Sequence, residues 1–158
     1  MLLSMSPTPT LKSEDIQGAV LRCACFNLRK AARAVTQMYD EFLRPSGLRA
    51  TQFSLLMLIR GEGPIRITDL AERAVMDRTT LKRNVELLER EGLVRVEAGE
   101  DARVREVRVT AAAEERLARA LPLWRRAQAH VTGELGHGRA DRLLADLSAT
   151  IATVEREA

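Results

Sequence analysis

Residues 64–110 constrain the fold most strongly, because the spacing of their apolar side chains changes within this one segment. Residues 69–74 and 78–91 have apolar positions three and four apart, which predicts two amphipathic helices separated by a short turn. Residues 93–97 and 104–109 then alternate apolar and charged side chains, as strands with one solvated face do. Two helices joined by a turn and followed by a hairpin predict a winged helix-turn-helix.

Polar residues mark the expected starts of the helices. We expect Thr51, Thr68, Asp77 and Thr110 each to cap the helix that follows, because their side chains can accept a hydrogen bond from a main-chain N–H of its first turn. Gly92 is placed to end the helix that begins after Asp77, since glycine readily adopts the left-handed conformation of a helix terminus.

Longer helices flank this region. Periodic apolar residues predict helices over 14–44, 52–60, from Thr110 to about residue 132, and 139–156, with Pro122 expected to bend the third of them. Aromatic residues make up only 3% of the chain, so the core must be built from leucine, alanine, valine and isoleucine. The expected fold class is therefore mainly α with a small β-wing.

The flanking helices predict how the chain is organised. Residues 1–13 read as a disordered tail, 49–110 as the winged helix-turn-helix, and 14–48 and 111–158 as dimerisation helices. The flanking helices have apolar faces wider than a small winged domain could cover; the last has Leu143, Leu147, Ile151 and Val154 on one stripe. They pack either on each other within one subunit or on those of a second chain. We favour the homodimer, because two DNA-binding regions about 34 Å apart, one from each chain, can bind the two halves of a palindromic site.

Overall charge does not by itself indicate a nucleic-acid partner. The net charge is +3, and residues 62–110 carry 10 basic against 11 acidic side chains. The charges are nevertheless sorted: basic residues open the helix 78–91 and acidic residues close it. Any surface that attracts DNA must therefore be local, at the start of this helix and on the wing.

The first turns of helix 78–91 have the composition of a helix that enters the major groove. Leu81 is expected to face the core while threonines and Arg83 point outward. Threonine suits thymine methyls or base edges, and arginine can bind guanine with two hydrogen bonds. Lys82 and Asn84 are expected to contact phosphates, which set register. The candidate DNA contacts on this helix are Arg78, Thr79, Thr80, Lys82, Arg83 and Asn84.

The hairpin offers a second contact with double-stranded DNA. Arg103 lies at its expected tip, where a side chain could enter the minor groove. Asp101 is placed to hold the Arg103 guanidinium by a charge-assisted hydrogen bond. Arg105 is a further candidate DNA contact; for Arg105 and Arg108 the alternative is an ordinary solvated strand face.

Residues 15–156 resemble the MarR family of bacterial transcription regulators. The resemblance is carried by LAERAVMDRTTLKRNVELLEREGLV together with the wing sequence from Asp101 to Thr110. It implies six helices, an obligate dimer formed by the terminal helices, and an Arg103 that enters the minor groove. Ala113 departs from the family, which usually has glycine just after the threonine that follows the wing.

Cys23 and Cys25 are the only cysteines in the chain. Residues two apart in a helix point about 200° apart, so a disulfide between them would require the helix to unwind. Neither His130 nor His137 has a metal-site spacing to them, so we predict no metal and no cofactor.

Two interpretations of these cysteines remain open. Cys25 and Tyr39, fourteen residues apart on roughly one helix face, resemble the peroxide-sensing branch of the same family, in which tyrosines stabilise a reactive thiolate. The second tyrosine of that branch falls at Ala50 here. The alternative is that both cysteines are small buried residues. The family resemblance also allows a small aromatic or anionic effector.

These features predict a homodimeric transcriptional regulator, acting as a repressor, that binds a pseudo-palindromic operator and is released by a small molecule or an oxidant. The alternative is a winged-helix protein-interaction module without DNA binding. No nucleophile–base pair, phosphate loop or metal set is recognisable, so we do not expect an enzyme. No apolar run reaches the roughly 18 residues of a membrane span, and residues 1–12 lack a secretory signal, so we expect a cytoplasmic protein with no membrane partner.

Overall fold

The computed structural model describes residues 12–99, 101 and 103–155. The predicted tail 1–13 lies outside the described residues except for its last two. The chain divides into two compact units, residues 1–37 and 38–158, which are described separately. The predicted division between residues 48 and 49 stays a prediction.

The first helical region is broken, and the prediction of one helix over 14–44 is wrong. Helix α1 spans Ser13–Arg22 and helix α2 spans Ala24–Leu43, with Cys23 extended between them at φ −71° and ψ 109°. The amide of Asn27 donates to the main-chain oxygens of Leu21 and Cys23, at 3.1 and 2.9 Å. The Leu21 carbonyl, whose partner in a continuous helix would be the Cys25 N–H, is thereby satisfied, which stabilises the break.

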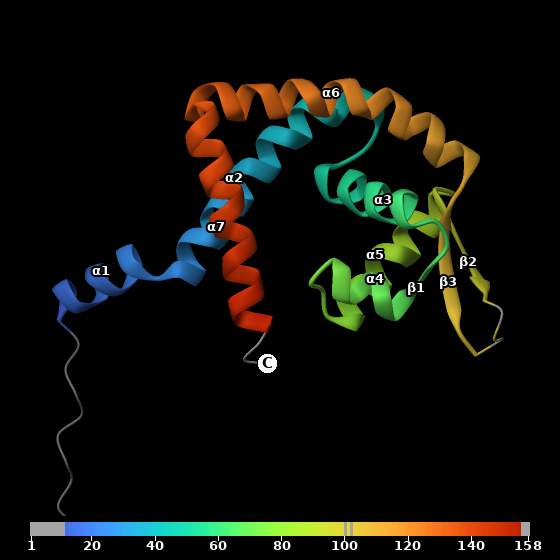
Figure 1. Ribbon diagram of the computed structural model, residues 1–158, viewed down its shortest axis with the longest axis horizontal. Coiled ribbons are helices and arrows are strands. Elements are labelled where there is room, and N and C mark those ends of the chain that lie inside the picture. The colour runs from blue at the N-terminus through green and yellow to red at the C-terminus, as the bar shows by residue number, and fades with distance from the viewer. Residues whose placement is uncertain (1–11, 100, 102, 156–158) are drawn as a thin grey trace, which may run out of the picture. The chain divides into compact units, whose positions relative to one another are not determined.

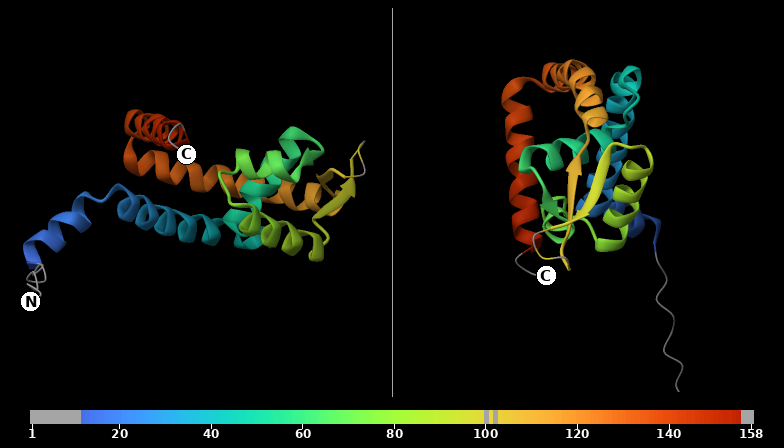
Figure 2. Two further views of the ribbon diagram at one scale, coloured as in Figure 1. Left: turned by 90° about the horizontal axis from the view of Figure 1, so that it is seen from below. Right: turned by 90° about the vertical axis from the view of Figure 1, so that its right-hand side faces the viewer.

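The second unit contains most of the helices and the only described sheet. After the end of α2, a short 3₁₀ turn spans Arg44–Ser46. The helices that follow are α3 (Ala50–Glu62), α4 (Ile67–Arg73), α5 (Arg78–Arg90), α6 (Ala111–Leu135) and α7 (His137–Glu155). Helix α6 continues through Pro122, and Gly136, at φ 78°, separates it from α7. In Figures 1 and 2 α7 and the hairpin lie at opposite ends of α6.

Two of the three strands form the predicted wing, and a third, short strand pairs with it. The strands are β1 (Ile65–Arg66), β2 (Val94–Ala98) and β3 (Arg105–Val109), in the order β1-β3-β2 with antiparallel pairing. Val107 of β3 lies opposite both Ile65 and Val96. The predicted hairpin is confirmed, with bounds shifted by about one residue, so the fold class of helices with a small β-wing is correct.

Aliphatic side chains from the helices and the sheet meet in one core under the wing. Helix α3 is buried on several sides, as its composition predicts, and Leu56 and Ile59 are completely inaccessible. The other fully buried large side chains are Leu43, Leu70, Leu81, Leu88, Leu93, Val94 and Val107. Helices α4 and α5 are therefore held against α3 and the sheet by apolar burial, which fixes where the second helix of the motif points.

Two of the four predicted caps are confirmed and two are wrong. Asp77 accepts the Thr80 N–H at 2.9 Å, and Thr110 accepts the Ala113 N–H at 3.2 Å. Helix α3 begins at Ala50, two residues earlier than expected, so Thr51 lies inside it. The N–H of its first residue, Ala50, is instead bound by a side chain of α2: Asp40 accepts this N–H at 2.7 Å. Helix α4 likewise begins at Ile67, which leaves Thr68 within its first turn.

The turn between α4 and α5 contains an unusual residue, Val75. The main-chain N–H groups of Val75 and Met76 donate to the oxygens of Glu72 and Ala71, at 3.0 and 2.9 Å, which forms a Schellman motif. Its left-handed position, usually glycine, is taken by Val75 at φ 50°. A β-branched residue is strained there, and 58% of Val75 is exposed, so little packing compensates.

We expect Val75→Gly to raise the free energy of unfolding by about 0.5–1 kcal/mol, because relief of left-handed strain exceeds the entropy that glycine adds to the unfolded chain. Urea denaturation at one fixed protein concentration measures this. Val75→Ala, which keeps the Cβ atom, should not stabilise the protein, and an equal gain from both variants would assign the effect to the lost methyl groups instead.

Candidate nucleic-acid interface

The N-terminal half of helix α5 has one face exposed to solvent and the opposite face buried. Leu81, Val85 and Leu88 are buried, as predicted. The exposed members of the predicted contact set on this helix are Arg78, Thr79, Thr80, Lys82 and Arg83. The apolar face fixes the helix against the core. The small and cationic side chains face outward, so that this surface of the helix can fit into a DNA groove.

Asp77 shapes the start of this surface. Hydrogen bonding to Thr80, first through its hydroxyl and then through its main-chain N–H, holds the pKa of the Asp77 carboxyl below its usual range. The stabilisation by this cap is present above the ordinary pKa of an aspartate and is lost as the pH falls through the lowered value. Asp77 is therefore ionised at neutral pH and accepts the main-chain N–H of Thr80 at 2.9 Å, while the Thr80 residue itself is exposed.

Two other predicted contacts on α5 have partners within the protein. Lys82 Nζ lies 3.8 Å from Glu86 Oε1, and both side chains are well exposed, so this pair is weak. The half-buried Asn84 directs its amide to the Met76 sulfur at 3.8 Å. Lys82 stays available to a phosphate, whereas Asn84 contacts the turn that precedes α5.

The tip of the wing differs from the prediction in one contact. Asp101 Oδ1 accepts the main-chain N–H of Arg103 at 2.9 Å, and the prediction that it holds the Arg103 guanidinium is wrong. The Asp101 carbonyl also accepts the Val104 N–H at 2.8 Å. A carboxylate two residues before a main-chain N–H closes a tight turn more readily than it reaches a long side chain. Asp101 thus shapes the turn, and the exposed Arg103 side chain extends from it.

Arg105 stabilises the edge strand of the wing by a hydrogen bond. Its guanidinium donates to the Val96 carbonyl at 3.0 Å, while Glu89 of α5 accepts the Val96 N–H at 3.1 Å. Val96 lies on the edge strand β2, whose outward main-chain groups would otherwise be unpaired. Sequence reasoning missed Glu89, and for Arg105 it offered a DNA contact or a solvated strand face but not this hydrogen bond; the DNA contact of Arg105 stays a prediction.

Several of the described cations that make no ion pair lie on α5 and the wing, the two elements predicted to contact DNA. Within the part of the chain that the structure describes, no ion pair involves Arg78 or Arg83 of α5, nor Arg95 or Arg103 of the wing. Arg108, by contrast, lies 3.1 Å from Glu97. Unpaired exposed guanidinium groups are free to bind phosphates or base edges.

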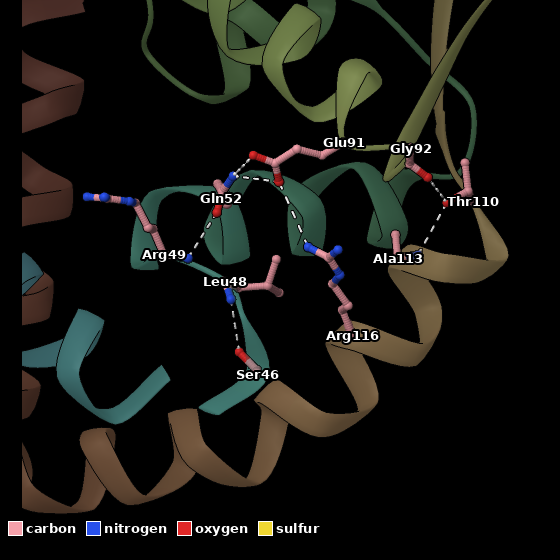
Figure 3. Close-up of polar contacts among 9 residues, drawn as sticks. All are labelled: Ser46, Leu48, Arg49, Gln52, Glu91, Gly92, Thr110, Ala113 and Arg116. Carbon is pink, nitrogen blue, oxygen red and sulfur yellow. Dashed lines mark hydrogen bonds and ion pairs between the residues drawn. The ribbon is translucent and has the colours of Figure 1, made fainter. Parts of the chain in front are cut away.

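Thr110 joins the wing to the end of α5 (Figure 3). Its hydroxyl donates to the Gly92 carbonyl at 2.7 Å and accepts the Ala113 N–H at 3.2 Å. Ala113 is completely buried, so its methyl group is accommodated at the position where the family usually has glycine. This single hydroxyl connects the start of α6 to Gly92, the second residue after α5.

The predicted sensing residues have different surroundings. Cys23 and Cys25 are exposed, so the alternative of two buried cysteines is wrong. The Tyr39 hydroxyl donates to Gln128 Oε1 of α6 at 2.5 Å, and burial raises the pKa of Tyr39. Tyr39 is therefore a neutral hydrogen-bond donor at physiological pH, bound to α6.

The described residues show neither a metal site nor a membrane-spanning helix. They contain no group of three or more histidine, cysteine or acidic side chains arranged to hold a metal ion. They also contain no helix with the length and apolar character needed to cross a bilayer.

Comparison with known proteins identifies relatives of this chain. The model of the MarR family matches residues 48–104. The transcriptional regulator MosR of M. tuberculosis, solved in complex with DNA, is 45% identical, with a TM-score of 0.74 over 84% of this chain and 98% of that protein. The transcriptional repressor CouR, solved with a 23-mer DNA duplex, is 28% identical, with a TM-score of 0.73 over 91% and 99%. YwoH of Bacillus subtilis (strain 168), an uncharacterized HTH-type transcriptional regulator, is 30% identical over 89 residues, which span 56% of this chain and 65% of YwoH.

Proposed function

The chain belongs to the MarR family of winged-helix DNA-binding transcription regulators, and we propose that it acts as a homodimeric cytoplasmic repressor of a pseudo-palindromic operator. In this proposal each α5 enters a major groove and each Arg103 reaches the adjacent minor groove. Occupation of the operator lowers transcription until a signal reduces the affinity for DNA.

The observation that carries this proposal is the exposed N-terminal half of α5. Thr79, Thr80 and Arg83 are exposed together on a helix whose opposite face is buried. Arg78 and Arg83 are without ion pairs among the described residues. A protein-docking helix would instead expose apolar or aromatic anchors.

The proposed homodimer is supported by α7. Leu143, Leu144, Ile151 and Val154 are between 45% and 62% exposed. A contiguous exposed apolar face of this kind marks an interaction surface. Covering it with the same face of a second chain gives the two-fold arrangement that a palindrome requires.

For the signal we propose oxidation of Cys25. A peroxide would transfer one oxygen to the Cys25 thiolate, which forms a sulfenic acid and releases an alcohol or water. The exposure of Cys25 supports access by the oxidant. The other proposed effector is a small aromatic or anionic molecule; a cavity of about 250 Å³ between α3 and α5, lined by Arg49, Leu55 and Leu87, is a candidate place for it.

One binding experiment tests the DNA and oxidant proposals together. An operator is first selected from random duplexes with the reduced protein, and affinity is then measured by fluorescence anisotropy at several salt concentrations. Log affinity should fall linearly with log salt, with a slope of about −0.9 for each neutralised phosphate. A hydroperoxide should weaken operator binding, a reductant should restore it, and Cys25→Ser should abolish the response.

Cys23→Ser is the matched control, because it removes the neighbouring thiol and keeps Cys25. Failure to select any preferred duplex would overturn the regulator proposal and favour a protein-interaction module. Selective binding that is insensitive to peroxide would remove only the oxidant signal. A response lost in Cys23→Ser but retained in Cys25→Ser would assign the sensing thiol to the other residue.

A further inference from the structure

The C-terminal end of α5 has a fixed main chain. The N–H groups of Gly92 and Leu93 donate to the oxygens of Glu89 and Leu88, at 2.9 and 2.8 Å, which forms a Schellman motif. Gly92 adopts the left-handed conformation that this motif needs, at φ 71°. Leu88 and Leu93 are both buried beneath it. The side chain of Glu91, the C-cap residue, therefore leaves the helix from a defined position.

Glu91 is bound by an amide of α3 whose orientation is determined. Gln52 Nε2 donates to both Glu91 carboxylate oxygens, at 3.2 and 3.1 Å. The oxygen of the same amide accepts the Arg49 N–H at 3.0 Å (Figure 3). Because a main-chain N–H only donates and a carboxylate only accepts, the Gln52 amide satisfies both partners in one orientation alone.

A third helix also reaches Glu91. Arg116 of α6 places a guanidinium nitrogen 3.9 Å from Glu91 Oε2, and both side chains are about one-third exposed (Figure 3). The carboxylate thus joins the end of α5 to the start of α3 and to α6. Helix α6 leads in turn to α7, the helix with the exposed apolar face.

We propose that Glu91 is a positioning residue for DNA reading: through Gln52 and Arg116 it sets the direction in which α5 presents residues 78–83. This inference rests on the proposed function. A helix of 13 residues is about 20 Å long, so a tilt of about 5° at its C-terminal end moves its first turn by about 2 Å. A displacement of that size breaks hydrogen bonds to base edges, whereas flexible cationic side chains still reach phosphates.

The sign of the effect separates positioning from simple electrostatics. Removal of an acidic side chain near DNA should, by charge alone, strengthen binding to any sequence. A positioning role predicts the opposite for the operator: affinity falls, and affinity for unrelated DNA does not. The ratio of the two affinities therefore reports position rather than charge.

The test measures this ratio for the selected operator and an unrelated duplex of equal length, using full-length protein. Glu91→Ala and Gln52→Ala should each lower the ratio by at least about threefold. The double variant should lower the ratio no further than the more affected single variant does, since both substitutions remove the same contact. Glu91→Gln, whose amide oxygen still accepts from Gln52, should retain most of the ratio. Glu115→Ala on α6 is the charge-matched control and should leave it unchanged.

Each outcome has a separate meaning. A parent protein that prefers no duplex contradicts the proposed function itself. A parent that prefers its operator while Glu91→Ala keeps the ratio overturns the positioning role, as would losses that add in the double variant. If Glu91→Ala does not fold, Gln52→Glu provides the same test, because it places a second carboxylate against Glu91 and should lower the ratio more than Gln52→Ala does.

Discussion

Ile151→Glu is expected to convert the dimer to monomers and to lower operator affinity by about 100-fold or more, because linking two binding heads raises avidity by about 10²–10⁴. Ile151 lies on α7 and is 47% exposed despite its apolar side chain. It shares a helix face with Leu147 and Leu144, one and two turns earlier. A glutamate at the centre of an apolar interface would lose its hydration without gaining a partner, so association should fail.

Sedimentation velocity measures the oligomeric state of this variant, and anisotropy measures its affinity for the operator. Ala149→Glu is the matched control, because it adds the same charge at an exposed position about 200° around the helix axis. The control should remain a dimer. A parent protein that is monomeric at all concentrations would contradict the proposal and support packing of the terminal helices within one subunit.

Arg83→Ala is expected to reduce discrimination between the operator and single-base variants of it by roughly 5- to 150-fold at one position, since a two-bond arginine–guanine contact contributes about 1–3 kcal/mol. Arg83 is exposed on α5. It has no ion pair among the described residues, so its guanidinium is available to a base. Affinity for unrelated DNA should fall much less.

Arg103→Ala should behave differently, because a side chain in the minor groove reads groove width rather than a base pattern. It should weaken operator binding and reduce the preference for A·T pairs beside each half-site. Arg108→Ala, which removes a wing arginine paired with Glu97, is the control for loss of charge. If Arg83→Ala and Arg103→Ala bound all duplexes as the parent does, the proposed reading surface would be wrong.

Much of the winged region was predictable from local spacing. The positions of Leu81, Val85 and Leu88 indicated α5 and its buried face, and Asp77 indicated its start. The prediction of one helix over 14–44 was wrong where a nearby side chain takes the place of a main-chain hydrogen-bond donor. Asn27 supports a break at Cys23 that apolar periodicity does not reveal, because the same residues would also fit a continuous helix.

The candidate site was predictable in part. Exposure of the threonines and arginines on α5 followed from the helical period, as did the place of the wing after it. The bonding partners of the charged and polar side chains could not be predicted in this way. Arg105 binds the Val96 carbonyl, and Asn84 contacts Met76, because both side chains have polar or polarisable partners within reach in the folded chain.

The sequence by itself determined most of the helices and the strands of the hairpin, and which face of α5 is polar. These properties depend on residues within one or two turns of each other, so their spacing is visible in the chain. Only the tertiary structure decided that Glu91 meets Gln52 and Arg116, and that Glu89 and Arg105 close the edge of β2. These contacts join residues of different helices and strands, and burial of the common apolar core is what brings those elements together.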